Sequence, residues 1–250
     1  VQVIDYSYLA SLGTAINVPT VEDAIAAFRP DVIGLSVFTF LYDEAQDMLR
    51  QIHACSKAPV LVGGPHVTLF PEDFSDDARV NYIVRGESEG VIDALVQSAS
   101  ATVKGQVLDA RLPALSELPR PNMALALGSE YLSEYQIQLS RGCPYKCTFC
   151  TVQKLAGNRI RPRDVSECLE ELVEAKKSVP SLKRIIVTDD CPTYDMNRFK
   201  SFLRRLTQLR LGCELWTDNM RANLIDEELL SLYGEAGGTN VCIGVESGSP

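Results

Sequence analysis

The chain has 250 residues, of which 46% are hydrophobic and 23% are charged, and its formal net charge is −9. This composition is that of a globular protein that can bury a sizeable core. The acidic balance argues against nucleic acid or an anionic membrane surface as the main partner. The longest uncharged apolar run, residues 32–42, is too short to cross a bilayer, which takes about 20 residues. No basic segment followed by an apolar one opens the sequence, so we expect a cytoplasmic protein.

Strand and helix patterns alternate over the first hundred residues. Nearly continuous apolar runs predict strands at residues 1–5, 31–39, 59–62 and 80–84. Helical spacing of apolar side chains predicts helices over residues 21–28 and 41–52. Strands that are apolar on both faces and alternate with helices predict a doubly wound parallel α/β sheet. We expect this first domain to span residues 1–98.

Residues 99–132 have few periodic apolar positions and contain three prolines, so we expect a linker there. A second β/α series follows over residues 133–250. Its strands are predicted at residues 135–139, 184–189, 214–216 and 241–245, with helices between them. Four such units predict the first part of a parallel (β/α) barrel, whose chemistry lies at the carboxyl ends of its strands. Strand-like runs lie close to both ends of the chain, so we expect a fragment truncated at both ends.

Three of the eight cysteines lie in the stretch SRGCPYKCTFC, residues 140–150, with the spacing C-x3-C-x2-C. Thiolates favour soft metals, so zinc and an iron–sulfur cluster are both candidates. A structural zinc site needs four ligands and would have to recruit Cys168, Cys191 or Cys242, each in apolar surroundings. Three thiolates on a 4Fe-4S cluster instead leave one iron open to a substrate or cofactor.

The cysteine spacing follows a strand and an Arg-Gly pair and has an aromatic residue before its third cysteine. This pattern resembles the radical S-adenosylmethionine (SAM) family. The resemblance implies that Cys143, Cys147 and Cys150 are catalytic and hold a 4Fe-4S cluster whose open iron binds SAM. One electron would cleave SAM to methionine and a 5′-deoxyadenosyl radical, which abstracts a substrate hydrogen. The positions that match SAM-contacting residues of the family are Phe149, Asp189, Asp190, Arg221, Glu246 and Ser247.

Some of these positions have alternative explanations. Adjacent strand residues point to opposite faces, so only one of Asp189 and Asp190 is expected to face the site. This pair stands where the family often has Gly-Gly-Glu, and it also fits the cap of a loop. Arg221 also fits a surface salt bridge. A basic patch at Lys154, Arg159, Arg161 and Arg163 is best explained as a solvated loop.

Two stretches of the first domain, VLVGGPHVTLFPED and YIVRGESEG, resemble the cobalamin (B12)-binding domain that precedes many radical SAM barrels. Such a domain is a flavodoxin-like or Rossmann-like sheet whose ligand binds at the carboxyl ends of the strands. The resemblance implies cobalamin-binding positions at Ser36, Thr39, Gly63, Gly64, His66, Gly86 and Glu87. His66 fits equally well as a structural histidine that is hydrogen-bonded at a strand end. The Asp-x-His-x-x-Gly loop that ligates cobalt in other cobalamin proteins is not found in the sequence.

These resemblances imply a cobalamin-dependent radical SAM enzyme, a transferase that methylates an unactivated carbon or phosphorus centre of a small molecule. Its electrons would come from a donor such as flavodoxin or ferredoxin. A sibling activity is anaerobic oxidative tetrapyrrole cyclisation, which the sequence does not separate from methylation. Methylthiotransfer would need further cluster-ligating cysteines in the first domain, where Cys55 stands alone. From a different class, a non-catalytic cobalamin carrier or sensor would bind structural zinc at the three cysteines.

Overall fold

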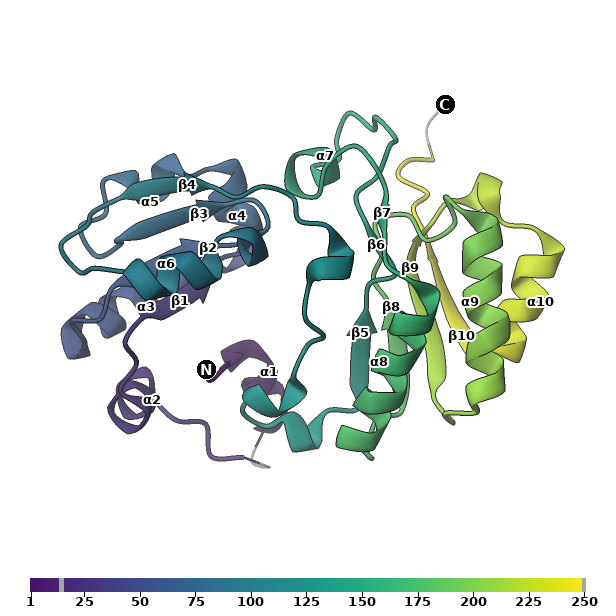
Figure 1. The fold of residues 1–250 in the computed structure, drawn as a ribbon, viewed down its shortest axis with the longest axis horizontal. Helices are drawn as coiled ribbons and strands as arrows, with labels where there is room; N and C mark the ends of the chain where they lie inside the picture. The colour runs from purple at the N-terminus through teal and green to yellow at the C-terminus, as the bar shows by residue number, and fades with distance from the viewer. Residues whose placement is uncertain (14–15, 249–250) are drawn as a thin grey trace. The chain divides into compact units, whose positions relative to one another are not determined.

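The structure is a computed structural model that describes residues 1–13 and 16–248 (Figure 1). It contains two compact units. The N-terminal unit comprises residues 17–114 and 146–157, and the barrel unit comprises residues 1–16, 115–145 and 158–250. Residues 1–16 group with the barrel unit and residues 146–157 group with the N-terminal unit, so the barrel unit and the N-terminal unit are each built from more than one segment. Within the described residues, none of the helices combines the length and apolarity needed to cross a bilayer.

The sheet of the N-terminal unit has four parallel strands in the order β1-β2-β3-β4. They are β1 (Ile33–Ser36), β2 (Val60–Gly63), β3 (Tyr82–Arg85) and β4 (Gln106–Asp109). The first three confirm predicted strands, whereas β4 lies in the segment that we expected to be a linker. Register pairs Ser36 with Gly63, so the carboxyl ends of β1 and β2 are neighbours.

Helices connect these strands, as a parallel sheet requires. They are α2 (Val21–Phe28), α3 (Tyr42–Cys55), α4 (Pro65–Leu69), α5 (Glu72–Ser75) and α6 (Ile92–Ser98). The first two confirm the helices predicted from apolar spacing. Leu95 of α6 packs against Leu61, Tyr82 and Val84 of the sheet. The short 3-10 helix η2 (Thr39–Leu41) follows β1 and leads into α3.

The sheet of the barrel unit has four parallel strands in the order β10-β9-β8-β5. They are β5 (Glu134–Ile137), β8 (Arg184–Val187), β9 (Glu214–Met220) and β10 (Gly238–Ile243). Helices α8 (Val165–Ser178), α9 (Met196–Leu209) and α10 (Glu227–Glu235) alternate with the strands and pack side by side against the sheet (Figure 1). Asp164, Asp195 and Asp226 cap these helices by accepting backbone N–H groups of the first turns. The predicted partial β/α barrel is therefore confirmed.

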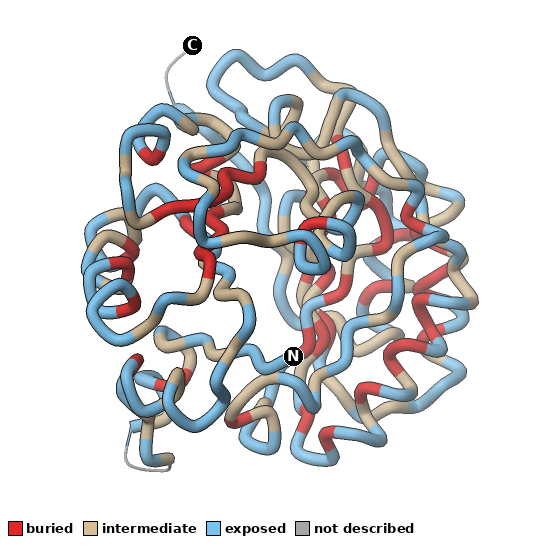
Figure 2. Tube along the Cα trace, turned by 60° about the vertical axis from the view of Figure 1, so that its left-hand side comes forward, coloured by how far each residue is buried: buried red, intermediate tan, exposed pale blue. Residues whose placement is uncertain are grey.

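The core of the barrel unit lies between this sheet and its three helices. Its largest buried side chains include Phe199 and Phe202 of α9, Leu172 of α8, Ile137 of β5 and Ile185 of β8. Figure 2 shows buried positions in red along the strands and on the inner sides of the helices. Burial of one such side chain contributes about 1.5–3 kcal/mol, so this core fixes where each strand ends.

Short elements complete the fold. They are α1 (Tyr6–Ser11), α7 (Val152–Leu155), β6 (Ser140–Arg141), β7 (Arg161–Pro162), η3 (Ser88–Gly90), η4 (Leu115–Glu117), η5 (Met123–Leu125), η6 (Ser129–Tyr131) and η7 (Ala222–Leu224). The strand predicted at residues 1–5 is wrong, because only Val3 forms an isolated bridge there, to Ala126. Its partner therefore belongs to the barrel unit and not to the first sheet.

Gly64, directly after β2, tests how tightly the strand ends pack. It has a φ of 99°, and a Cβ on it would lie 2.9 Å from Ser36 Oγ and from the backbone N and O of Val37. We expect Gly64→Ala to lower the free energy of unfolding by about 1–3 kcal/mol in urea titrations, since alanine is strained there and has no room. Gly34→Ala is the matched control, because Gly34 lies in β1 with open space around it. Equal losses for the two variants would contradict this account.

Candidate functional site

The three predicted cluster cysteines lie in a loop that is closed at its base. β6 and β7 pair antiparallel on either side of residues 142–160. Next to this pair, the N–H of Arg163 donates to the carbonyl of Leu139 at 2.9 Å. β6 comes directly after β5, so the loop leaves the barrel sheet at the carboxyl end of its first strand. This is the edge at which a parallel barrel places its chemistry.

The cysteines themselves are accessible thiols. Cys143 is half-buried, and Cys147 and Cys150 are exposed. The N–H of Cys150 donates to the carbonyl of Cys147 at 3.1 Å, so the C-x2-C pair lies on one tight turn. Among the residues that the structure describes, no three Cys, His, Asp or Glu side chains are gathered as they would be around a metal ion. The loop thus carries three soft donors of the kind that an iron–sulfur cluster takes.

The buried thiols of the barrel unit are poorer metal ligands. Cys168 on α8 and Cys191 after β8 are buried, and burial raises the pKa of both thiols, that of Cys168 to about 11. A metal takes the thiolate, so a raised pKa weakens the ligand. Cys242, which we expected in apolar surroundings, is exposed on β10. The three loop thiols, those of Cys143, Cys147 and Cys150, are therefore the donor set that fits a soft metal.

Asp189 holds the chain just before the cysteine loop. Its side chain lies beyond β8 and the residue is 1% exposed. One carboxylate oxygen accepts the backbone N–H of Leu139 at 2.6 Å, and the other accepts the hydroxyl of Ser140 at 2.5 Å. Burial raises the pKa of Asp189 to about 6, although both hydrogen bonds oppose the rise. Both oxygens are therefore engaged by protein groups.

Asp190 also binds the loop. Its Oδ2 accepts the N–H of Gly142, the residue before Cys143, at 2.7 Å. Strand alternation predicted that only one of the two carboxylates would face the site. β8 ends at Val187, so alternation does not extend to these two residues, and which of them faces the site stays a prediction. The explanation of the pair as a loop cap fits the observed hydrogen bonds.

Arg221, after β9, contacts the cysteine loop. Its Cζ lies 3.9 Å from the centroid of the Tyr145 ring, and Tyr145 stands between the first two cysteines. The same ring meets Tyr194 edge-on, with centroids 6.1 Å apart. Among residues 1–13 and 16–248, which the structure describes, the buried Nε of Arg221 has no hydrogen-bond partner. An orphaned buried donor at a strand end is a group that a bound ligand can satisfy.

The remaining predicted SAM positions are exposed. Phe149 is 66% exposed, which leaves its ring free to lie against a flat ligand. Glu246, after β10, has a φ of 61°, a strained conformation for a residue other than glycine. Such strain is typical of functional sites. The N–H of Ser247 donates to the carbonyl of Val245 at 2.7 Å in the same turn.

A buried ion pair next to the loop was missed by the sequence analysis. Arg163, expected in a solvated loop, is only 16% exposed at its side chain and pairs with Glu171 of α8, which is 4% exposed. Tyr135 donates to the other oxygen of Glu171 at 3.0 Å, and Arg163 donates to the carbonyl of Gln138 at 3.1 Å. The solvated-loop explanation is therefore wrong for Arg163. The signal was present, because Glu171 follows the inward Cys168 by three residues, on the same face of the helix.

Asn219 is a second residue that the sequence analysis missed. The register between β9 and β10 shifts beside it, and its φ is 60°. Its amide donates to the backbone carbonyl of Asp189 at 3.4 Å. Bulges of this kind re-aim side chains and are frequent next to active sites. The carboxyl ends of β8 and β9 are thereby tied together.

The predicted cobalamin positions gather at the carboxyl edge of the first sheet. They are Ser36, Thr39, Gly63, Gly64, His66, Gly86 and Glu87. The hydroxyl of Thr68 donates to the carbonyl of Gly64 at 2.9 Å and accepts the N–H of Gly86 at 3.0 Å, which links the ends of β2 and β3. A cavity of about 200 Å³ opens at the ends of β3 and β4, where Arg85, Gly86 and Lys154 contribute to its lining.

His66, on α4, is 5% exposed. It packs against three aromatic rings, those of Tyr42, Phe70 and Phe74. Its Nδ1 lies 3.1 Å from Thr39 Oγ1, and its Nε2 lies 3.0 Å from a carboxylate oxygen of Asp73. Both ring nitrogens are thus hydrogen-bonded within the protein. This geometry favours the second of the two explanations for His66, a structural histidine.

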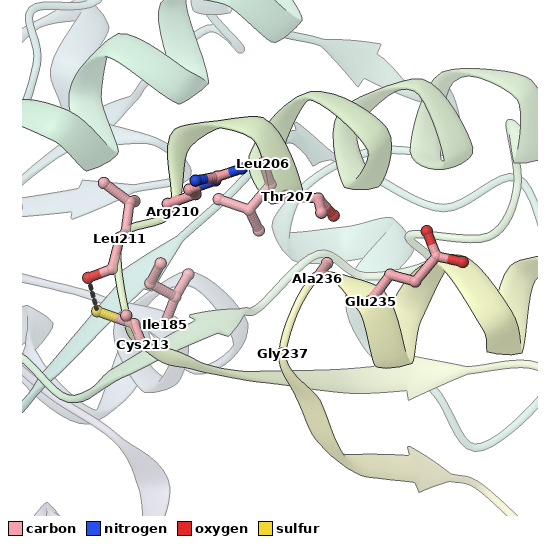
Figure 3. A pocket seen from close by; sticks show the side chains of 10 residues that line it. Ile185, Leu206, Thr207, Arg210, Leu211, Cys213, Glu235, Ala236 and Gly237 are labelled. Carbon is pink, nitrogen blue, oxygen red and sulfur yellow. Dashed lines mark hydrogen bonds between the residues drawn. The ribbon is translucent and has the colours of Figure 1, made fainter.

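A larger cavity, of about 370 Å³, lies at the amino ends of the barrel strands (Figure 3). Ile185 of β8, Cys213 before β9 and Gly237 before β10 contribute to its lining. Cys213 donates its S–H to the carbonyls of Leu182 at 3.5 Å and Leu211 at 3.7 Å. Because the chemistry of a parallel barrel lies at the opposite strand ends, this cavity is not part of the candidate site.

Asp189→Ala tests the role of this carboxylate. The variant leaves the N–H of Leu139 and the hydroxyl of Ser140 without their acceptor, so we expect the free energy of unfolding to fall by about 2–4 kcal/mol in urea titrations. Asp189→Asn is the matched control, because an amide can accept from Leu139 and donate to Ser140. We expect the control to lose less than half as much. Equal losses of unfolding free energy in the two variants would show that the negative charge of Asp189, and not its pair of hydrogen bonds, stabilises the fold.

The pH dependence of stability gives a second test of Asp189. Burial raises its folded-state pKa to about 6, above its usual value of 3.8, so the folded protein binds this proton more readily. Its contribution to stability is therefore fully present below the unfolded pKa and is lost as pH rises from about 4 to about 6. We expect a decline of about 3 kcal/mol in the parent protein. Asp189→Asn should remove that decline, and an unchanged slope would contradict the assignment.

Comparison with known proteins supports both halves of this description. The B12 binding domain model matches residues 2–96, and the Radical SAM superfamily model matches residues 137–250. The chain is similar to an uncharacterized methyltransferase of Pyrococcus horikoshii, with 26% identity over 98% of this chain and 58% of that protein. It is similar to the anaerobic magnesium-protoporphyrin IX monomethyl ester cyclase of Rubrivivax gelatinosus, with 27% identity over 97% of this chain and 48% of that one. The chain thus spans about half the length of these relatives.

The fold is also that of a solved structure. The radical SAM methyltransferase TsrM from Kitasatospora setae, with tryptophan substrate and a SAM analog bound, has a TM-score of 0.68 and 18% identity. The match covers 92% of this chain and 51% of TsrM. It confirms the expected fold class of two successive parallel α/β sheets. The two domain matches, which together cover most of the chain, show that it belongs to the radical SAM proteins that carry a B12-binding domain.

Proposed function

We propose that this chain works in a cobalamin-dependent radical SAM enzyme that methylates a small-molecule substrate. The observation that carries the proposal is that the loop with the three thiols begins at the carboxyl edge of the barrel sheet. Side chains from the ends of two neighbouring strands hold its base. Asp189 and Asp190 bind the residues that lead into the loop, and Arg221 stacks on Tyr145 within it.

In this proposal Cys143, Cys147 and Cys150 hold a 4Fe-4S cluster, for which three soft thiol donors on one loop are a fitting set. When bound, the cluster supplies the electron that cleaves SAM, and cobalamin carries the methyl group. The chain's own part is to orient SAM. The buried Nε of Arg221 donates to it, Phe149 covers its flat base, and the turn at Glu246 and Ser247 contributes polar groups.

The two adjacent carboxylates differ in their proposed roles. Asp189 has both oxygens bound by Leu139 and Ser140, so we assign it to positioning the loop and not to contacting SAM. Asp190 accepts the N–H of Gly142 beside the first cysteine and remains a proposed SAM contact. This assignment agrees with the expectation that only one of the two carboxylates faces the site.

Cobalamin is proposed to bind at the carboxyl edge of the first sheet, where Ser36, Gly63, Gly64, Gly86 and Glu87 lie on neighbouring strand ends. Gly64 allows the backbone to come close to the end of β1, and the Thr68 hydroxyl ties this edge together. We assign His66 to holding the edge and not to ligating cobalt, since both of its nitrogens are engaged.

Methylation is preferred to tetrapyrrole cyclisation because a curated relative and the solved structure TsrM are both described as methyltransferases. The cyclase remains the second candidate, since one is 27% identical over nearly the whole chain. The two activities differ in their products. A methyltransferase uses a second SAM to restore its methyl carrier and releases S-adenosylhomocysteine beside 5′-deoxyadenosine, whereas a cyclase releases no S-adenosylhomocysteine.

Metal analysis of the chain reconstituted without oxygen tests the cluster. We expect about four irons per chain and a reduced-state electron paramagnetic resonance signal that changes when SAM is added. Replacing Cys143, Cys147 or Cys150 by alanine should remove most of the iron, because each supplies one of three thiolates. An electron donor such as reduced flavodoxin or ferredoxin should support SAM cleavage in place of dithionite.

Cys191→Ala is the control for this experiment. Cys191 lies close enough to Cys143 to influence it electrostatically, so it is the cysteine that a four-ligand zinc site would recruit. A three-thiolate cluster predicts unchanged iron in Cys191→Ala. One zinc per chain, lost in this variant as well as in the loop variants, would instead favour the non-catalytic cobalamin carrier.

A further inference from the structure

A chain of three side chains crosses the carboxyl edge of the first sheet, from Asp73 through His66 to Thr39. The carboxylate of Asp73 lies 3.0 Å from Nε2 of His66, and the hydroxyl of Thr39 lies 3.1 Å from Nδ1. The histidine between them is buried among aromatic rings, so the imidazole cannot turn toward solvent. The two ends are accessible, because Thr39 and Asp73 are exposed residues.

When His66 is neutral, the chemistry of Asp73 and Thr39 fixes which group donates in each of its two hydrogen bonds. An ionised carboxylate only accepts hydrogen bonds, so Nε2 of His66 must carry the proton that is donated to Asp73. In a neutral imidazole the other nitrogen then has only a lone pair, and Nδ1 accepts. Beside a neutral imidazole, the hydroxyl of Thr39 therefore donates inward. Its remaining capacity is the pair of oxygen lone pairs, which accept.

Thr39 also stands in a setting that fits a large ligand. Its neighbours Phe38 and Phe40 are 43% and 78% exposed, with ring centroids 5.6 Å apart. Exposed aromatic side chains around one polar atom are typical of a surface that an amphipathic molecule covers. The structure describes no second hydrogen bond of the Thr39 hydroxyl among its residues 1–13 and 16–248.

We propose that Thr39 is a hydrogen-bond acceptor whose polarity is set by Asp73 and His66, and that it selects an N–H or O–H donor of the bound ligand. This inference rests on the proposed function, in which the ligand is cobalamin. Cobalamin offers two such donors, the primary amides around its corrin ring and the ribose hydroxyl of its nucleotide tail. A phosphate oxygen or a ring nitrogen with a lone pair cannot serve, because neither one donates.

Titration of the full chain with cobalamin tests the acceptor. We expect Thr39→Val to weaken binding roughly three- to tenfold and Thr39→Ser to stay within about twofold, since one neutral hydrogen bond is lost only in the first. Cobinamide, which keeps the amides and lacks the nucleotide, separates the two donors. The same Thr39 dependence with cobinamide assigns the donor to an amide, and its loss assigns the donor to the ribose.

A double-mutant cycle tests whether Asp73 acts on Thr39 through His66, an arrangement that we call the relay. Asp73→Asn keeps the shape of the Asp73–His66 pair and lets the proton of the imidazole move from Nε2 to Nδ1. It should therefore weaken cobalamin binding in the parent chain and have no further effect in the Thr39→Val background. A purely structural role of Asp73 predicts the same loss in both backgrounds, which would overturn the relay. Nitrogen NMR of labelled histidine gives a direct check, because the chain has only two histidines and His53→Gln assigns the signals. The relay requires a proton on Nε2 of His66, and a proton on Nδ1 would overturn it.

The possible negative results distinguish a failure of the proposed function from a failure of the inference about Thr39. If the parent chain does not bind cobalamin, the proposed function and the inference both fall. If it binds and Thr39→Val binds equally well, the inference falls and the proposed function stands. If bound cob(II)alamin shows nitrogen coupling that disappears in His66→Gln, the histidine ligates cobalt and the relay is wrong.

Discussion

The carboxylate of Asp189 is the interaction on which the barrel site depends. β5 stops at Ile137, so the N–H of Leu139 has no partner in the strand ladder and needs an acceptor elsewhere. The neighbouring strand provides that acceptor two residues past its own end. A buried carboxylate is costly without partners, and the hydroxyl of Ser140 provides the second hydrogen bond. The result is a fixed point from which the cysteine loop begins.

Other contacts extend this fixed point without replacing it. The pair of β6 and β7 closes the loop, and Arg163 with Glu171 fills the space beside α8. A buried ion pair of this kind adds specificity more readily than stability, because desolvation offsets much of its attraction. In the first sheet, other polar side chains tie the strand ends and the elements that follow them. Thr68 joins two strand ends, and His66 connects η2 to α5. In both units the polar side chains rest on strand ends that the core has already set.

Periodicity predicted the elements that have a substantial apolar face. The strands β5, β8 and β9 and the helices α3, α8, α9 and α10 bury such faces, and their positions follow from the sequence. β4 was missed because three of its four residues are exposed, which leaves no apolar run to detect. Residues 1–5 have a strand-like pattern, yet Val3 pairs with a segment that is far away in sequence. No local signal specifies that choice.

The sequence predicted which residues belong to the site but not which contacts they make. The cysteine spacing indicated a cluster loop, but strand alternation could not place Asp189 and Asp190 beyond the end of β8. A charge on a basic loop looks solvated until a buried acid is known to face it, which is why the role of Arg163 required the fold. Pairings of this kind join residues that are not adjacent in sequence. They follow only from tertiary structure.

The three cysteines of the loop differ in how their backbone is held by the rest of the protein. Cys143 follows Gly142, whose N–H is held by Asp190, so the first donor stands next to a clamped backbone. Cys147 and Cys150 are exposed on a turn in a stretch without regular structure. A metal takes cysteines as thiolates, and like charges repel, so bringing three thiolates together costs free energy that metal binding offsets. The contacts at the base of the loop therefore fix the backbone beside the first donor, and the free energy of metal binding is what would bring the three thiolates together.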